Sequence, residues 1–217
     1  MKIFKDRQAA GKLLAKRLKN VSSDLVLGIP RGGVVVAAEV ARKLSLPLDV
    51  LVVRKIGAPF QSELALGAVD GDGEVVWEED LLKEVGVSRE ELGDIIKNEW
   101  KELKRREDLY RAGKGELNVD GKVVILVDDG IATGATTLSA INYLKRHKAK
   151  VILAIPVASK EAVDKIRAVE GVRDVVLEIP EYFQAVGQFY QDFLPVSDEE
   201  VVEILRLPFD FAQGRSG

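Results

Sequence analysis

The sequence predicts an α/β protein in which a parallel β-sheet is flanked by helices. Short apolar runs that suit buried strands alternate with longer segments of helical periodicity, which is the order of successive βαβ units. The chain has 217 residues, 47% of them hydrophobic, and this suffices for one substantial domain. We expect this single domain to span residues 1–207, with a mostly helical insertion at 70–115 and a small C-terminal hood at 180–207. Residues 208–217 lack a pattern and are expected to form a disordered tail.

The N-terminal part is predicted to form a helix followed by a βαβ unit. Asp6 suits the N-cap of the first helix, because its carboxylate can accept a backbone hydrogen bond, and apolar residues follow at helical spacing. The apolar run at 25–29 predicts a strand, 34–44 a helix, and 48–53 a second strand parallel to the first.

Between residues 54 and 69 the periodicity is broken by Gly, Pro and Ser, and we expect a long mobile connection that ends in a short strand at 64–69. The sequence Asp-Gly-Asp-Gly at 70–73 predicts a hairpin turn leading to a strand at 74–77. Its two aspartates also resemble the start of a phosphatase Asp-x-Asp motif, but Glu74 stands where that motif has Thr or Val. The turn is therefore the preferred interpretation.

The remainder of the chain returns to regular alternation after one long helix. Residues 88–91, Ser-Arg-Glu-Glu, form a capping-box pattern, and apolar residues at helical spacing extend the predicted helix to about Tyr110. Basic and acidic residues are interleaved at 101–107, which favours a solvated helix face over a basic patch. The later predicted elements are strands at 123–127, 151–157 and 174–179, helices at 138–148 and 160–170, and a short last helix that begins with the capping box at 197–200.

Composition restricts the chemistry available to this chain. It has no cysteine, and its single histidine, His147, is expected near a helix end in a structural role, so thiol nucleophiles, zinc clusters and His-centred triads are excluded. The 32 Lys and Arg against 35 Asp and Glu give a net charge of −3, which argues against a nucleic-acid partner. No apolar stretch approaches the roughly 20 residues that span a bilayer, and a signal-peptide pattern is absent. We expect a cytoplasmic protein with no membrane partner, and a homodimer is left open.

The strongest functional signal lies at residues 123–137, VVILVDDGIATGATT. Five apolar residues predict a buried strand, Asp128 and Asp129 come at its carboxyl end, and a Gly/Thr-rich loop leads into a helix. The N–H groups and hydroxyls of such a loop, together with the positive end of the helix dipole, suit a phosphate group. Carboxylates beside a bound phosphate need donors such as sugar hydroxyls, or a hard cation such as Mg²⁺. The segment therefore indicates a site for a ribose phosphate.

Other motifs fit this segment less well. A Walker P-loop needs Gly-Lys-Ser/Thr, but Ala135 follows Gly134, and no predicted strand is followed by the Gly-x-Gly-x-x-Gly of dinucleotide-binding folds. A receiver domain of two-component signalling would need a phosphoacceptor Asp after a later strand, but Ala158 and Ser159 follow the strand at 151–157. A strand, loop and helix without a ligand would leave two adjacent carboxylates at a buried strand end without partners, which is costly.

The segment resembles the signature loop of type I phosphoribosyltransferases (PRTases), which bind 5-phosphoribosyl-1-pyrophosphate (PRPP). The resemblance implies a type I PRTase-like fold in which Asp128 and Asp129 hold the ribose hydroxyls, with or without Mg²⁺ between them, and so act as catalytic and metal-binding residues. Members that act on 6-oxopurines carry an Asp where this chain has Ala132, so a hypoxanthine–guanine activity is not implied. The residues implied to bind the 5′-phosphate are Ala132, Thr133, Gly134, Ala135, Thr136 and Thr137.

The resemblance also assigns roles to the loops after the first two strands. Arg31, Gly32 and Gly33 correspond to a pyrophosphate-binding loop, and Arg31 offers a fork of donors for phosphate oxygens. Arg54 and Lys55 are the implied catalytic cations that receive negative charge on the leaving group. Residues 56–69 correspond to a flexible loop that closes over the site and excludes water.

Together these features resemble an uncharacterised group of the superfamily labelled only as predicted phosphoribosyltransferases, and the implied activity is that of an Mg²⁺-dependent enzyme of the pentosyltransferase type. It would transfer 5-phosphoribose from PRPP to a small nitrogenous, nucleobase-like acceptor and release pyrophosphate. The alternative is a non-catalytic, PRPP-sensing regulatory protein on the same fold. A hydrolase or phosphotransferase is a third possibility, but it needs a water-activating base, and none is evident beyond the two aspartates. Four aromatic residues of the hood could stack on the acceptor or pack in the core: Tyr182, Phe183, Phe189 and Tyr190.

Overall fold

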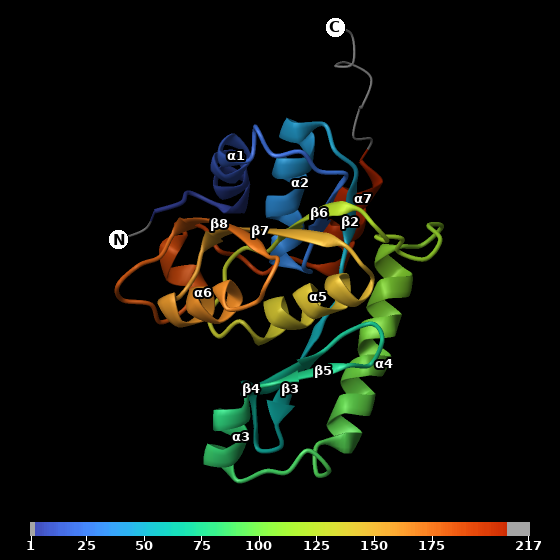
Figure 1. The fold of residues 1–217 in the computed structure, drawn as a ribbon, viewed down its shortest axis with the longest axis vertical. Helices are drawn as coiled ribbons and strands as arrows, with labels where there is room; N and C mark the ends of the chain where they lie inside the picture. The colour runs from blue at the N-terminus through green and yellow to red at the C-terminus, as the bar shows by residue number, and fades with distance from the viewer. Residues whose placement is uncertain (1–2, 208–217) are drawn as a thin grey trace, which may run out of the picture.

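A five-stranded parallel β-sheet forms the centre of the molecule in the computed structural model, which describes residues 3–207 (Figure 1). Its strand order is β2-β1-β6-β7-β8, and each neighbouring pair runs parallel. The predicted α/β class with a parallel sheet flanked by helices is therefore confirmed. The strands are β1 (Leu25–Gly28), β2 (Leu48–Val50), β6 (Val123–Val127), β7 (Lys150–Val157) and β8 (Arg173–Glu178).

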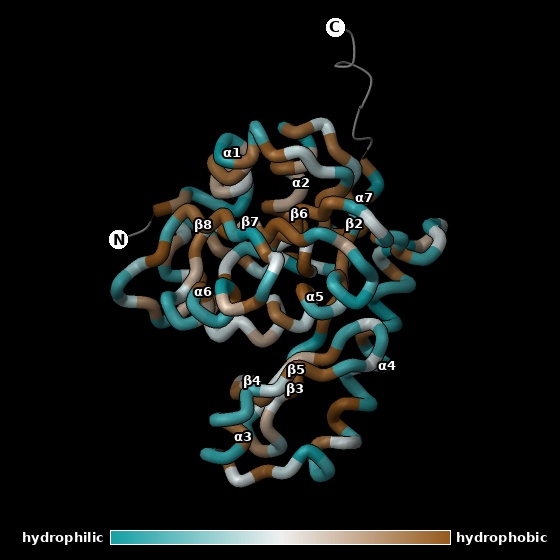
Figure 2. The backbone as a smooth tube through the Cα atoms, viewed as in Figure 1, coloured by the Kyte–Doolittle hydropathy of each residue, from teal (hydrophilic) through white to brown (hydrophobic). Residues whose placement is uncertain are grey.

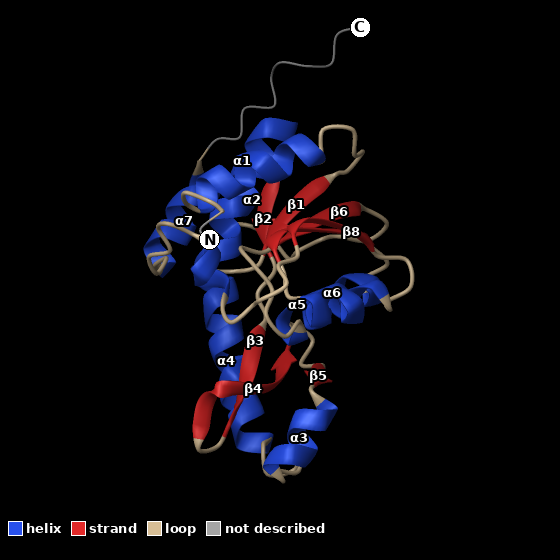
Figure 3. Ribbon diagram, turned by 90° about the vertical axis from the view of Figure 1, so that its left-hand side faces the viewer, coloured by secondary structure: helices blue, strands red, loops and turns tan. Residues whose placement is uncertain are grey.

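Helices cover both faces of this sheet (Figure 3). Along β6, Val124 and Leu126 belong to the core shared with α5 and α6, whereas Ile125 and Val127 belong to the core shared with α1, α2 and α7. Successive side chains of a strand point to opposite faces, so this central strand is apolar at every position and is brown along its length in Figure 2. The helices are α1 (Arg7–Arg17), α2 (Gly32–Leu44), α5 (Ala135–Arg146), α6 (Lys160–Arg167) and α7 (Asp198–Arg206).

Residues 54–110, called the insertion below, form a smaller body that projects from the sheet (Figure 1). A three-stranded antiparallel sheet packs with two helices around its own apolar core, which includes Ile56, Leu66, Leu82 and Leu92. Residues 70–115, where a mostly helical insertion was expected, hold both helices and β5, while β3 and β4 precede them. The elements are β3 (Arg54–Ala58), β4 (Gln61–Val69), β5 (Val75–Trp77), α3 (Glu79–Val85) and α4 (Gly93–Tyr110).

Strands β3 and β4 form a hairpin in place of the long mobile connection expected over residues 54–69. The pairing register shifts on either side of Gly57, and a Cβ atom there would lie 2.5 Å from the backbone oxygen of Ser62. Such irregular pairing destroys the two-residue alternation by which a strand is recognised. The strand pair could not be recognised from the sequence pattern, because Gly57 allows the two backbones to approach closely and interrupts the alternation.

The turn predicted at residues 70–73 is confirmed, since the amides of Asp70 and Gly73 donate to the carbonyl oxygens of Glu74 and Asp70. Asp70 is buried, and its carboxylate accepts hydrogen bonds from the amides of Asp72 and Glu74 at 3.0 and 3.2 Å and from Arg146 Nη2 at 2.6 Å. His147, the C-cap residue of α5, places its Nε2 atom 3.1 Å from Asp72 Oδ2. The first aspartate of the apparent Asp-x-Asp motif is thus a structural anchor between the insertion and α5.

Most predicted helix signals act as expected, although some boundaries move. The carboxylate of Asp6 caps α1, and the capping box of Ser197 and Glu200 begins α7. Ser88 and Glu91 make the hydrogen bonds of a capping box, but α4 begins only at Gly93 and then ends at Tyr110 as predicted. Basic residues at 104–106 pair with glutamates of the same helix, which agrees with a solvated face.

The C-terminal hood packs against the start of the chain. Phe189 and Tyr190 are buried, and the backbone of Phe4 bridges that of Tyr190. Phe183 packs on Phe189 with ring centroids 5.3 Å apart, whereas Tyr182 is 79% exposed. Among the described residues, none of the helices has the length and apolar character that a bilayer crossing requires. The tail expected at residues 208–217 lies outside the described residues.

Replacing Asp70 by Ala is expected to lower the free energy of unfolding by about 2–3 kcal/mol, because two turn amides and half-exposed Arg146 lose a charged acceptor. Replacing the exposed Asp72 by Ala is the control and should cost at most about 1 kcal/mol. Urea denaturation of the two variants measures both values. Equal losses would contradict the anchoring role of Asp70.

Candidate functional site

The loops that follow β1, β2 and β6 meet at one edge of the central sheet. Strand β1 lies between β2 and β6, and the carboxyl ends of neighbouring parallel strands share an edge, which is where open α/β sheets bind ligands. Arg31 follows β1, Arg54 and Lys55 follow β2, and Asp128 and Asp129 follow β6. The structure therefore places at one edge the residues that the sequence singled out in three separate segments.

Two glycines allow the loop after β1 to lie directly against the two aspartates. A Cβ atom on Gly32 would lie 1.9 Å from Asp129 Oδ2, and one on Gly33 would lie 2.8 Å from the Cα atom of Asp128. Any side chain at these positions would therefore collide with the loop after β6. The resemblance assigned Gly32 and Gly33 to a pyrophosphate-binding loop, and the structure shows in addition that both glycines lie against the two aspartates.

The Gly/Thr-rich loop leads into α5 three residues earlier than predicted. Gly134 has φ +95°, a left-handed conformation that suits glycine, and the helix begins at Ala135 rather than 138. Ala135, Thr136 and Thr137 therefore form the first turn of α5, whose N–H groups have no acceptors within the helix. This turn presents free donors and the positive end of the helix dipole at the edge where Asp128 lies.

Side chains of this loop face different surroundings. Thr136 Oγ1 is buried and has no hydrogen-bond partner among the described residues, and Thr136 lines a cavity of about 550 Å³. Thr137 is buried in the protein, while Ala132 and Thr133 are exposed. Ser159, the N-cap of α6, donates to the carbonyl oxygen of Ala132 at 2.6 Å and so fixes the loop. A buried hydroxyl without a partner is expensive unless a ligand supplies one.

Asp129 is held from two sides, by Arg7, which no sequence motif marked, and by Tyr190, which was expected only to stack on the acceptor or pack in the core. Arg7 Nε donates to Asp129 Oδ2 at 2.7 Å, and both side chains are largely buried, with 11% and 15% exposed. The hydroxyl of Tyr190 donates to the backbone oxygen of Asp129 at 2.6 Å, and burial raises the pKa of this tyrosine. One signal in the sequence pointed to Arg7: a basic residue in the first turn of a helix opposes the helix dipole.

Asp128 has a different environment. Burial and the neighbouring charge of Asp129 raise the pKa of Asp128 well above the ordinary value, while the Asp129 amide at 2.8 Å and the charge of Lys55 act in the opposite direction. Among the described residues, Asp128 has no basic side chain within 4.0 Å. An unpaired carboxylate of this kind is suited to a cation or to hydroxyl donors.

The protein supplies only some of the ligands that a bound Mg²⁺ ion would need. Among residues 3–207, no group of three or more His, Cys, Asp and Glu side chains could hold a metal ion. Mg²⁺ is, however, commonly bound by one or two carboxylates together with substrate phosphates and water. Asp128, which has no basic partner among the described residues, fits this arrangement. Asp129 is already paired with Arg7, so it would have to bind the ion while it keeps that ion pair.

The cavity beside the loops is completed by the insertion. Its walls include Pro30 from the loop after β1 and Thr136 from the first turn of α5. The insertion contributes Lys55 from β3 and Ile95, Glu99 and Arg106 from α4. No motif in the sequence marks these α4 residues, because they belong to a long charged helix. The long helix therefore does more than support the antiparallel sheet, since it forms one side of the cavity.

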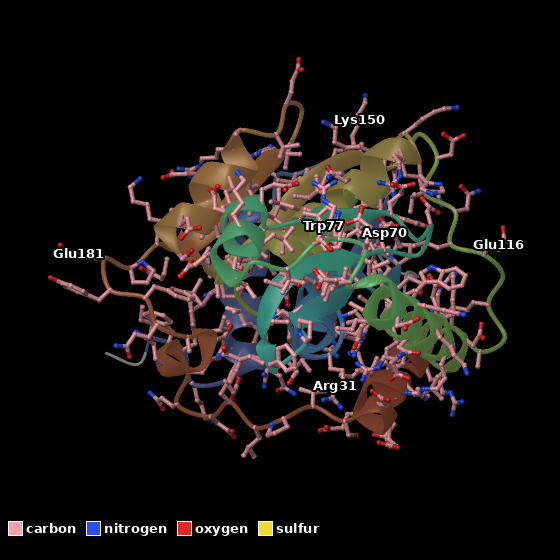
Figure 4. All side chains as sticks on the ribbon, turned by 90° about the horizontal axis from the view of Figure 1, so that it is seen from below. Arg31, Asp70, Trp77, Glu116, Lys150 and Glu181 are labelled. Carbon is pink, nitrogen blue, oxygen red and sulfur yellow. The ribbon has the colours of Figure 1, made fainter. Side chains whose placement is uncertain are left out.

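Two of the three predicted cations at this edge are already paired with acidic residues. Arg54 Nη2 lies 2.6 Å from Glu99 Oε2 of α4. Arg31 Nη1 lies 3.8 Å from Asp198 Oδ1 at the start of α7, and Figure 4 shows Arg31 beside that helix. Lys55 is exposed. An anionic ligand at this edge would compete with Glu99 and Asp198 for the two guanidinium groups.

The sequence matches the family described as "Phosphoribosyl transferase domain" over residues 3–190. A Mycobacterium tuberculosis (strain H37Rv) protein named "putative phosphoribosyl transferase" is 44% identical over 219 residues, which cover 98% of this chain and 49% of that protein. This chain thus spans about half the length of the curated relatives that it matches.

Two solved structures share the fold. The protein TT1426 from Thermus thermophilus has 42% sequence identity and a TM-score of 0.77, over 94% of this chain and 97% of that one. A hypothetical protein from Neisseria gonorrhoeae with bound ppGpp has 16% identity and a TM-score of 0.53, over 94% and 96% of the two chains. At that identity the second likeness concerns the fold alone. With the family match over most of its length, this chain belongs to the phosphoribosyl transferase family.

Proposed function

We propose that this chain binds PRPP and transfers its 5-phosphoribosyl group to a nitrogenous acceptor, with release of pyrophosphate. The observation that carries the proposal is the contact of the Arg31–Gly33 loop with Asp128 and Asp129, beside the first turn of α5, whose N–H groups have no acceptors within the helix. This edge offers phosphate donors, ribose acceptors and cations within one set of loops. The name of the Mycobacterium tuberculosis relatives, which are 44% identical to this chain, supports the same class of activity.

Each part of PRPP has a matching group of residues. The 5′-phosphate is proposed to lie at the first turn of α5, where the backbone N–H groups have no acceptors within the helix and the buried Thr136 hydroxyl has no partner among the described residues. The ribose hydroxyls donate to Asp128 and Asp129. The pyrophosphate lies toward the Arg31 loop, with Arg54 and Lys55 at its outer side, where the cavity is lined by the same two residues.

Mg²⁺ is the proposed cofactor, held by Asp128 and shared with Asp129. When bound, it would neutralise part of the charge of the pyrophosphate leaving group. Asp128 is the better protein ligand of the two, because Asp129 already pairs with Arg7. The protein supplies too few carboxylates to hold the ion alone, so its binding is expected to depend on PRPP.

The reaction is a substitution at the ribose C1 atom. The bond from C1 to the pyrophosphate oxygen breaks with its electron pair on that oxygen, a bond from C1 to the acceptor nitrogen forms, and the acceptor loses its proton. Positive charge develops on the sugar ring, beside the two aspartates, and negative charge on pyrophosphate, beside Arg31, Arg54 and Lys55. Loss of one such contact typically costs about 2–4 kcal/mol of transition-state stabilisation.

The acceptor is proposed to be a small, nucleobase-like ring other than a 6-oxopurine, because this chain has Ala132 where family members that act on 6-oxopurines carry an Asp. Of the four hood aromatics considered for stacking, Phe189 and Tyr190 are core residues and Phe183 packs on Phe189. Only Tyr182 among them is free of the core, with 79% of its surface exposed. A cytoplasmic location and a homodimer stay predictions.

One observation favours the alternative of a PRPP-sensing regulatory protein. Arg31 and Arg54, the two arginines expected at the leaving group, are both engaged by acidic residues of peripheral helices. A sensor could couple ligand binding to the release of these pairs, since a ligand shifts a conformation by its differential affinity for the two states. An enzyme would instead recruit the freed guanidinium groups at the transition state.

Binding of PRPP tests the site itself. The wild-type chain is expected to bind PRPP in the presence of Mg²⁺, and the double variant Asp128→Asn, Asp129→Asn should lose at least about 100-fold in affinity, because both charges that face the ribose and the cation are removed. Isothermal titration calorimetry measures the two constants. Unchanged affinity in the double variant would contradict the proposed site.

Turnover distinguishes the enzyme from the sensor. We expect pyrophosphate release when the protein is incubated with PRPP, Mg²⁺ and a panel of nitrogenous bases, and we expect it only with an acceptor that is ribosylated. A coupled pyrophosphate assay follows the reaction, and mass spectrometry identifies the product. PRPP binding without turnover across the panel would favour the sensor, whereas absent binding would reject both candidates.

Replacing Glu99 by Gln is expected to raise the affinity for pyrophosphate with Mg²⁺ by roughly 3- to 10-fold, because the carboxylate that competes for Arg54 loses its charge. Glu107→Gln is the control on the same helix, since Glu107 pairs with Lys104 and is not part of the cavity wall around Arg54. Calorimetric titration with pyrophosphate compares the variants. Weaker binding in Glu99→Gln would show that Glu99 orients Arg54 instead of competing for it.

A further inference from the structure

Arg7 occupies an unusual position for a basic residue. It is the first residue of α1, where the helix dipole disfavours a cation, and it is 122 residues from Asp129 in the sequence. Its guanidinium nevertheless donates to Asp129 Oδ2 at 2.7 Å, and 11% of its side chain is exposed. Arg7 thus lies next to the Asp129 carboxylate of the candidate site, although the dipole of α1 disfavours a positive charge at this end of the helix.

Three contacts fix the guanidinium group of Arg7 in one orientation. Nε donates to Asp129, Nη1 donates to the backbone oxygen of Leu194 at 2.8 Å, and Cζ lies 3.8 Å from the ring centroid of Phe193. The guanidinium is therefore stacked on an aromatic face and shared between a carboxylate and a carbonyl group. Such a group has little freedom to leave Asp129.

The other side of Asp129 is also restricted. Its Oδ2 atom lies where a side chain of residue 32 would begin, so only the glycine there leaves room for this position of the carboxylate. Its backbone oxygen accepts the hydrogen bond of Tyr190 at 2.6 Å. Residues 4–7 at the start of the chain and residues 189–194 of the hood therefore hold one aspartate at the edge of the central sheet.

We propose that Arg7 is a positioning residue that holds the Asp129 carboxylate in the orientation required to accept the ribose hydroxyls of PRPP. With Oδ2 fixed by Arg7, Oδ1 is the oxygen left to accept from the substrate, and the positive charge of Arg7 offsets the repulsion between two adjacent carboxylates. The inference rests on the proposed function, because it assigns a role to Arg7 in the same site.

Variants at Arg7 and at a matched arginine test this role. Arg111 is the control, because its pair with Asp49 is as buried as that of Arg7, with 11% and 13% of the two side chains exposed, and joins α4 to β2 away from Asp129. Arg7→Gln keeps a donor but removes the charge, Arg7→Lys keeps the charge, and Arg111→Gln removes an equivalent pair. PRPP affinity with Mg²⁺ and the thermal midpoint are measured for the full chain of each variant.

Arg7→Gln is expected to weaken PRPP binding by roughly 10- to 100-fold. Arg7→Lys keeps the positive charge but loses the fork of donors, so its PRPP affinity is expected to lie within about 5-fold of the wild-type affinity. Arg111→Gln should lower the thermal midpoint comparably while it changes PRPP affinity less than about 2-fold. Recovery by Lys and separation of affinity from stability are results that a merely structural arginine would not give.

Four outcomes decide the matter. If the wild type does not bind PRPP, the proposed function fails and the role of Arg7 fails with it. If the wild type binds and Arg7→Gln behaves like Arg111→Gln, the proposed function stands and Arg7 is only structural. If Arg7→Lys binds as weakly as Arg7→Gln, the inference is also wrong. If Arg7→Gln does not fold, Arg7→Lys against Arg111→Lys gives the same comparison, and an equal PRPP affinity in these two variants would overturn it.

Discussion

The contact between the loops after β1 and β6 is the constraint from which the rest of the site follows. Parallel neighbours in a sheet bring the ends of two strands within a few ångströms, and only small residues let both loops occupy that space. Gly32 and Gly33 meet this requirement, because a side chain on Gly32 would collide with Asp129 and a side chain on Gly33 would collide with Asp128. The carboxylates, the first turn of α5 and the arginine loop are placed by this one contact.

Elements outside the central sheet balance the charges at this edge. Arg7 of α1 pairs with Asp129, Glu99 of α4 with Arg54, and Asp198 of α7 with Arg31. A largely buried charge without a partner is costly, so removal of one member of the Arg7–Asp129 pair in the absence of ligand is expected to destabilise the protein. The same ion pairs affect the affinity for a ligand, because a phosphate or hydroxyl group that binds here must share a charged side chain with its partner in the protein or displace that partner.

Much of the fold was predictable because its signals are local. The continuous apolar run of β6 and the capping boxes at 88–91 and 197–200 depend on residues close in sequence, and they form the expected contacts. The hairpin of β3 and β4 was missed, since the irregular pairing around Gly57 removes the alternation that marks a strand. The start of α5 was predicted three residues too late because a Gly/Thr-rich segment has weak helical propensity. In the structure the left-handed Gly134 is the N-cap, and the helix begins at Ala135.

For the candidate site, the sequence by itself determined which chemical groups end the strands: two adjacent carboxylates, a Gly/Thr-rich loop and an Arg-Gly-Gly turn, each contiguous in the chain. Only the tertiary structure decided their partners. Arg7 and Asp129 are 122 residues apart, and Arg54 and Glu99 are 45 apart, so no local pattern links them. Local periodicity and capping depend on neighbours along the chain, whereas ion pairs between distant elements exist only after the sheet, the insertion and both chain ends have packed together.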